Sequence, residues 1–181
     1  MRHKYETRGI VLSRTSAGET NALITIITED VGLVRARAQG VRRSGAKLAA
    51  ALATFAESSF VLVRGNEGWR VAGAVLQDNW FERIKNSGAR ARAARVSGLL
   101  LRLVAGEETD SIIFPIVTDF FKSLTALSED LHEAVEILAV LRILAVLGLD
   151  KGEIPKELSI IVEKRTQFIA RINQGIEASG L

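Results

Sequence analysis

The spacing of apolar and polar positions divides the chain into two parts with different periods. Between Thr7 and Val75 the apolar residues come in short runs that are rich in branched side chains and separated by turn-forming residues. This pattern predicts β-strands. After Gln77 the apolar residues recur every three or four positions, which predicts helices. We therefore expect an N-terminal domain over residues 1–77 and a helical domain over residues 78–181.

The order of elements in the first part predicts a barrel. Three strand-like segments come first, followed by the alanine-rich "KLAAALATF", which predicts a short helix. Two further strand-like segments surround "GNEG", a typical hairpin turn. This is the element order of a five-stranded OB-fold barrel with a helix between its third and fourth strands. The predicted fold class is α+β, with a mostly β N-terminal half and an all-α C-terminal half.

The second part predicts four helices that form a small bundle. They are expected at Trp80–Ala105, Ser111–Leu127, Leu131–Leu147 and Pro155–Ile176. The third is apolar nearly all round, so it should be the buried centre, with His132 near its start as a surface residue. The last carries one apolar stripe, formed by Leu158, Ile161, Val162, Ile169, Ile172 and Ile176.

Composition narrows the function classes. The chain has 181 residues, 48% of them apolar and 25% charged, which is typical of a globular protein. No segment reaches the roughly 20 apolar residues of a membrane span, and the N-terminus lacks an apolar signal region. We therefore expect a cytoplasmic location and no membrane contact. The absence of cysteine excludes disulfides, thiolate metal sites and a cysteine nucleophile.

The sequence contains few residues that indicate a catalytic site. His3 and His132 lie in separate halves without metal-ligand spacing, and no phosphate-binding loop or dinucleotide fingerprint occurs. A loose group of acids favours a loop and helix cap, with a metal-dependent nuclease as a distant alternative. These acids are Glu107, Glu108, Asp110 and Asp119. We expect a protein that is not an enzyme and holds no cofactor or metal.

Positive charge is concentrated in the first half. Residues 1–76 carry 11 Lys and Arg against 6 Asp and Glu. The stretch from Arg35 to Lys47, "RARAQGVRRSGAK", has five cations and no acid. Such a concentration favours a polyanion as the partner, although barrels also use arginine simply to keep their outer face polar.

The cations of this stretch are the predicted DNA contacts. Arg35 and Arg37 share one strand face and can follow a phosphate backbone together, and the next cations extend the patch over a loop. An OB barrel commonly presents its second and third strands to oligonucleotides. The predicted DNA-binding residues are Arg35, Arg37, Arg42, Arg43, Lys47 and Arg70. Trp69, Phe55 and Phe60 are expected in the core, which leaves Tyr5 as the candidate stacking ring and phosphate contacts as the dominant ones.

A second group of arginines lies in the helical part. Arg92, Arg95 and Arg102 fall within an arc of about 80° on a helical wheel, beside an apolar stripe. They could extend a nucleic-acid track, or they could be arginines whose stems cover the border of the core.

The residue order resembles that of a known family. The segment "TRGIVLSRTSAGETNALITIITEDVGLVRARAQGVRRSGAKLAAAL" resembles the N-terminal region of RecO, the bacterial recombination mediator. More loosely, "VEILAVLRILAVLGL" resembles a helix of that family which ends in a Leu-Gly turn. The resemblance implies an OB-fold domain followed by a helical domain. It also implies binding of single- and double-stranded DNA, strand annealing, and loading of the RecA recombinase on strands coated by single-stranded DNA-binding protein (SSB).

The resemblance further implies partners. These are RecR, in some systems RecF, and the acidic C-terminal tail of SSB. The tail would need basic and apolar residues side by side, for which the candidates are Arg92, Arg95, Arg102 and Arg142. Many RecO proteins carry a cysteine-bound zinc-finger-like insertion after the Leu-Gly turn. Because this chain has no cysteine, it resembles a compact variant without that zinc.

The leading hypothesis is thus a non-enzymatic, nucleoid-associated DNA-binding and strand-annealing recombination mediator in DNA repair. The alternative is an OB-fold interaction scaffold whose basic face binds an acidic protein partner rather than DNA.

Overall fold

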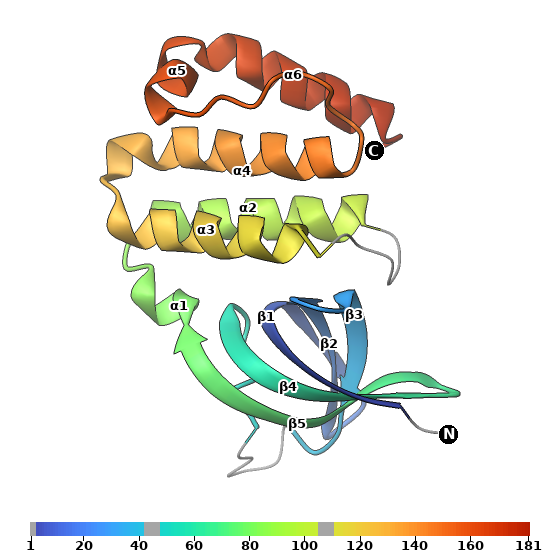
Figure 1. The fold of residues 1–181 in the computed structure, drawn as a ribbon. Helices are drawn as coiled ribbons and strands as arrows, with labels where there is room; N and C mark the ends of the chain where they lie inside the picture. Colours follow the sequence, from blue (N-terminus) through green and yellow to red (C-terminus); the bar gives the residue numbers. More distant parts are fainter. Residues whose placement is uncertain (1–2, 42–47, 105–110) are drawn as a thin grey trace. The chain divides into compact units, whose positions relative to one another are not determined.

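The computed structural model describes residues 3–41, 48–104 and 111–181, and its N-terminal part is a closed five-stranded barrel (Figure 1). Its strands are β1 (His3–Ala17), β2 (Asn21–Thr28), β3 (Gly32–Ala38), β4 (Ala56–Gly65) and β5 (Gly68–Asn79). They are hydrogen-bonded in the order β1-β2-β3-β5-β4, with β3 and β5 parallel and the other pairs antiparallel. The predicted α+β class, with a five-stranded barrel first, is confirmed.

Strand β1 closes the barrel because it pairs on both sides. Its first part pairs with β4 from His3 to Ile10, and its second part pairs with β2 from Gly9 to Ala17. At the overlap, a Cβ on Gly9 would lie 2.7 Å from Ile26 Cγ2 and 2.9 Å from the Ile27 carbonyl oxygen. Only glycine fits this crossing without displacing the neighbouring strand.

Alternating residues of the strands fill the barrel interior. On β3 the side chains of Val34, Ala36 and Ala38 are buried, whereas the arginines between them are exposed, as the pattern predicts. Phe55, Phe60 and Trp69 are also buried, so their predicted place in the core is confirmed. The core cluster comprises Val11, Ala22, Ile24, Ile26, Val34, Ala36, Ala38, Val41, Leu52, Phe60, Leu62, Trp69 and Val71.

The predicted short helix before β4 is wrong, because residues 48–55 form turns. One helical hydrogen bond forms, from the Leu52 amide to the Leu48 carbonyl at 3.0 Å. The chain then reaches Phe55, which has a left-handed φ of 67° and donates its amide to the Val11 carbonyl at 2.8 Å. Burial of Phe55 against the barrel overrides the helix propensity of the alanines before a second turn can form.

The C-terminal part is helical. Its elements are α1 (Trp80–Arg83), α2 (Ser87–Leu103), α3 (Ile113–Ala126), the 3-10 helix η1 (Glu129–Leu131), α4 (His132–Val146), α5 (Leu158–Glu163) and α6 (Arg165–Ala178). The backbone divides into two compact units. The barrel unit comprises Met1–Arg83 with Gly106–Phe114, and the helical unit comprises Ile84–Ala105 with Pro115–Leu181. Among the described residues, no helix is long and apolar enough to cross a membrane.

Two predicted helices are broken in the structure. The first stops at Arg83 and restarts at Ser87, because the Asn86 side chain accepts the Ala89 amide at 2.9 Å and so caps a new helix. The last begins at Leu158 rather than at Pro155 and is interrupted at Lys164. As a result α5 is a six-residue helix that buries Ile161, whereas Val162, expected in the apolar stripe, is 54% exposed.

Helix α4 is the buried centre of the helical unit, as predicted. Nine of its residues are buried, and it packs against α2, α5 and α6. His132 at its start is only 4% exposed, so its predicted surface position is wrong. The ring is buried because it turns back to the preceding turn, where Nε2 lies 3.1 Å from the Leu127 carbonyl oxygen.

Candidate nucleic-acid interface

Three arginines share the outer face of the barrel where β3 and β5 run side by side. Arg35 and Arg37 extend from β3, and Arg70 extends from β5; all three are exposed. The parallel register pairs Arg37 with Arg70 and, on the inner face, Ala36 with Trp69. Because the side chains of Ala36 and Trp69 pack into the barrel interior, the next residues of the two strands, Arg37 and Arg70, extend to its outer surface.

This arrangement continues around the barrel as a row of register partners. Arg70 pairs with Val63 on β4, and Val63 pairs with Lys4 on β1. We call Arg37, Arg70 and Lys4 the basic row. Lys4 also contacts Glu6 at 2.7 Å, which lowers the pKa of the Glu6 carboxyl through a hydrogen bond from the Lys4 ammonium.

A groove of about 580 Å³ lies beside the basic row, between the end of β3 and the β4–β5 hairpin. Its lining includes Arg37, Gln39, Val63, Glu67 and Arg70. The Glu67 carboxylate lies 3.5 Å from Arg37 Nη1, and these two side chains are 89% and 65% exposed. Within the part of the chain that the structure describes, no ion pair engages Arg35 or Arg70.

The aromatic residues at this end of the barrel offer limited stacking surface. Tyr5 is 38% exposed and packs edge-on against Trp69, with ring centroids 5.0 Å apart. The Arg64 guanidinium lies 5.5 Å from the centre of the Trp69 ring on its face. Trp69 is buried, and its indole N–H has no hydrogen-bond partner among the described residues. Charge is therefore the main chemistry that this surface offers to a ligand.

Three of the predicted DNA contacts lie outside the described residues. Arg42, Arg43 and Lys47 belong to the segment 42–47, between the described ranges 3–41 and 48–104. The structure thus brings together Arg35, Arg37 and Arg70, and the role of all six stays a prediction.

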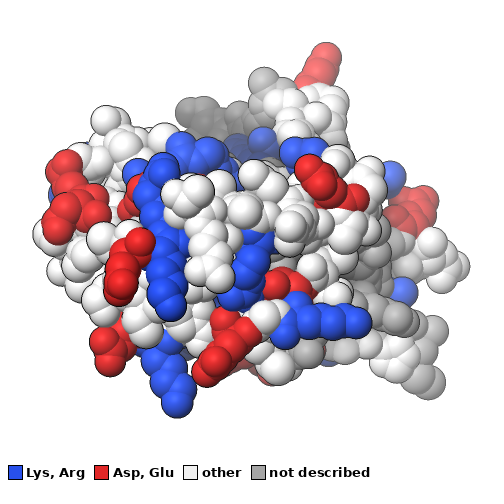
Figure 2. All heavy atoms as spheres, turned by 90° about the horizontal axis from the view of Figure 1, so that it is seen from above, with Lys and Arg blue, Asp and Glu red and all other residues white. Residues whose placement is uncertain are grey.

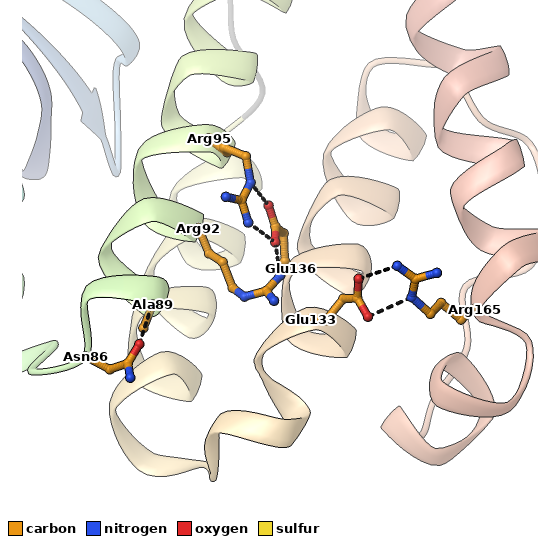
Figure 3. A network of polar contacts seen from close by, with 7 residues as sticks. All are labelled: Asn86, Ala89, Arg92, Arg95, Glu133, Glu136 and Arg165. Atoms are coloured by element: carbon orange, nitrogen blue, oxygen red, sulfur yellow. Dashed lines mark hydrogen bonds and ion pairs between the residues drawn. The ribbon is translucent and has the colours of Figure 1, made fainter.

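Two of the arginines predicted on the helical half, Arg92 and Arg95, contact one carboxylate (Figure 3). Arg92 Nη1 and both Arg95 Nε and Nη2 contact the carboxylate of Glu136 on α4, the Arg95 distances being 2.8 Å each. The side chain of Glu136 is 15% exposed, and its hydrogen bond raises the pKa of Arg95. Arg92 and Arg95 therefore join α2 to α4, a role that the sequence analysis missed. The sequence contains one indication of this contact: Glu136 is a charged residue within an apolar run, and a buried charge is usually paired with an opposite one.

Two hollows of the helical unit combine apolar walls with arginine. The first, about 420 Å³, is lined by residues of α2, α4 and α6, including Leu99, Arg102, Val140 and Ile172. The second, about 280 Å³, is lined by α3, α4 and α5, including Arg142, which is half-buried. In the described part of the chain, neither Arg102 nor Arg142 takes part in an ion pair.

The face of the helical unit seen in Figure 2 carries both signs of charge. Viewed from above, where α5 and α6 lie in Figure 1, Lys and Arg alternate with Asp and Glu. The helical unit contains several ion pairs, including Arg165 with Glu133 at 2.7 Å and Arg171 with Asp150. This face is therefore not a continuous cationic surface.

The described residues contain no cluster of side chains that could form the metal site of a nuclease. Over 3–41, 48–104 and 111–181, no three His, Asp or Glu side chains gather as metal ligands. Of the acids considered for a metal site, Glu107, Glu108 and Asp110 lie outside those ranges.

Comparison with known proteins agrees with the sequence pattern. Residues 1–76 match the family model described as "Recombination protein O N terminal". A protein of Dehalococcoides mccartyi named DNA repair protein RecO is 26% identical over 122 residues, which cover 67% of this chain and 48% of the relative. Proteins of the same name from Acetivibrio thermocellus and Nostoc sp. are 27% and 24% identical, over 79% and 82% of this chain and 57% and 51% of their own lengths. The chain spans about half the length of the curated relatives it matches, and the predicted resemblance to the RecO family is confirmed.

Proposed function

We propose that this chain, whose first 76 residues match the RecO N-terminal family, is a non-enzymatic DNA-binding protein that acts in DNA repair as a recombination mediator. The observation that carries the proposal is the register pairing of Arg37 with Arg70 on the outer face of the barrel, with Arg35 on the same strand. Two guanidinium groups on adjacent strands repel each other unless an anion lies between them. A phosphodiester backbone supplies such anions at regular intervals.

The mechanism is charge neutralisation. Arginine binds phosphate with paired N–H groups, so the basic row and Arg35 hold a strand by its backbone. A surface that neutralises two strands lowers their mutual repulsion while their bases pair, which promotes annealing. Because the exposed aromatic surface is small, we expect little base readout and a strong dependence on salt.

The helical unit is proposed to bind protein partners. Arg102 and Arg142 each lie beside apolar walls and have no ion pair within the described residues. A peptide with carboxylates and apolar side chains, such as the acidic tail of SSB, matches that chemistry. Arg92 and Arg95 are less suited because Glu136 already engages both. Assistance to RecA, contacts with RecR and RecF, and a cytoplasmic, nucleoid-associated location are proposed from the resemblance alone.

The proposal is tested by fluorescence anisotropy with labelled single- and double-stranded oligonucleotides over a range of salt. We expect sequence-independent binding that weakens linearly in log affinity against log salt, and faster annealing of complementary strands in the presence of the protein. Binding that is undetectable even at low salt would refute it.

A second candidate is a scaffold that binds an acidic protein segment. The two hollows favour it, because each contains an arginine that has no ion pair in the described ranges. This candidate requires tight binding of an acidic SSB-tail peptide and negligible binding of naked oligonucleotides near about 0.15 M salt. Anisotropy with both probes on the same preparation separates the two functions.

A further inference from the structure

We propose that Glu67 is an internal counter-ion that competes with a DNA phosphodiester for the Arg37–Arg70 pair and so sets the affinity of the groove. The inference rests on the proposed function and specifies how the same site is regulated. It follows from the position of the carboxylate, from the turn that holds it there, and from the chemistry of the groove.

The position of Glu67 is determined by a tight hairpin. Gly65 and Gly68 are the last register pair between β4 and β5, so Asn66 and Glu67 form the tip of the hairpin, which projects beyond the barrel in Figure 1. Gly68 has a φ of 94°, a left-handed conformation that glycine adopts without strain. This turn directs the carboxylate back along the groove to Arg37, thirty positions earlier in the chain.

Glu67 is the single acid among the described residues that line the groove. Its contact with Arg37 is one long hydrogen bond of 3.5 Å, not the bidentate arrangement that Arg165 makes with Glu133. Such exposed pairs are weak. A carboxylate that is 89% exposed can therefore withdraw into water when a better anion arrives.

A phosphodiester is the better anion for this pair. Arg37 and Arg70 extend from adjacent strands, so one phosphate between them can accept hydrogen bonds from both guanidinium groups. Glu67, by contrast, contacts Arg37 and, among the described residues, no second arginine. Without DNA the carboxylate lessens the repulsion between the two arginines. With DNA bound it lies near the strand and repels it, which weakens binding and favours release.

The test is anisotropy of a labelled oligo(dT) with four proteins: wild type, Glu67→Gln, Arg37→Ala and the double variant. We expect Glu67→Gln to bind about two- to fivefold more tightly, the range that a weak exposed ion pair supports. Its salt slope should steepen by about 0.7, corresponding to one further phosphate neutralised. In the Arg37→Ala background, Glu67→Gln should increase the affinity for oligo(dT) clearly less, because the arginine that Glu67 contacts is absent.

Glu177→Gln is the matched control, since it removes one exposed acid from the helical unit and changes net charge equally. An affinity of Glu67→Gln equal to that of wild type, or equal to that of Glu177→Gln, would overturn the inference, as would the same gain with and without Arg37. These outcomes differ from a failure of the proposed function, in which Arg37→Ala itself leaves DNA binding unchanged.

Discussion

Arg37 on β3 and Arg70 on β5 are register partners on two parallel strands of the closed barrel, and both side chains face outward. Like charges directly opposite each other destabilise a sheet. The register therefore places two positive charges side by side on the outer face of the barrel, and a polyanion bound across them would offset their repulsion.

The first prediction concerns Arg70. Its replacement by Gln removes the repulsion with Arg37 while keeping a polar side chain of similar length. We expect thermal stability that is unchanged or slightly higher, and single-stranded DNA affinity that is several-fold lower for every sequence tested. Thermal unfolding and anisotropy on the same samples measure the two effects. A loss of stability together with unaltered DNA affinity would assign Arg70 a structural role instead.

The second prediction compares the two tryptophans. Trp80 is 2% exposed and donates its indole N–H to Glu57 Oε2 at 2.9 Å, whereas Trp69 has no such partner among the described residues. Replacement of Trp80 by Phe deprives a buried carboxylate of a donor, which costs about 1–3 kcal/mol beyond the lost packing. Trp69→Phe is the matched control, because it removes a similar ring without breaking a hydrogen bond. Urea unfolding should show the larger loss for Trp80→Phe, and equal losses would contradict the role of this bond.

The third prediction concerns the Glu136 contact between α2 and α4. Glu136→Gln removes the charge that Arg92 and Arg95 share, and we expect it to lower the free energy of unfolding by about 1–3 kcal/mol. Arg102→Ala on α2 should change the free energy of unfolding by no more than about 0.5 kcal/mol, because the Arg102 side chain is exposed. Denaturant unfolding of both variants provides the comparison. Equal stability of the two would show that the Glu136 contacts do not hold the helices together.

The fourth prediction is a pH dependence. Arg165 donates two hydrogen bonds of 2.7 Å to Glu133, which lowers the pKa of that carboxyl below its ordinary value of 4.5. A lowered pKa in the folded state contributes stability above the unfolded value, and this contribution is lost as the pH falls through the folded value. Glu133→Gln should therefore be less stable than wild type at pH 7, and the difference should shrink below about pH 4. Glu163→Gln, an exposed acid with no ion pair in the described residues, should show no such convergence.

The sequence predicts those features that depend on local alternation. The inward Val34 and Ala36 and the outward Arg35 and Arg37 follow directly from a strand of period two. Features that depend on distant contacts were not predictable. Phe55 ends a turn where alanines favour a helix, because its ring is buried in the barrel. In the same way the burial of His132 at the start of α4 depends on the packing of that helix within the helical unit, which the local pattern does not encode.

The candidate site was predictable in part for the same reason. The alternation of side chains along a strand places Arg35 and Arg37 on one face, but it does not predict which strand lies beside β3. The pairing of Arg37 with Arg70 and the approach of Glu67 depend on closure of the barrel, which joins β3 to β5 across thirty residues. Likewise, the capture of Arg92 and Arg95 by Glu136 depends on helix packing that no local pattern encodes.

If the outer arginines of the barrel bind the backbone of DNA, their removal must change the salt dependence of binding. The experiment compares oligo(dT) binding over a range of salt by wild type and by a folded variant in which Arg35, Arg37 and Arg70 are all replaced by Ala. We expect the triple variant to bind more weakly, with a slope of log affinity against log salt that is smaller in magnitude by about 2, since each lost phosphate contact removes about 0.7. A folded triple variant that binds with the affinity and salt slope of wild type would contradict it.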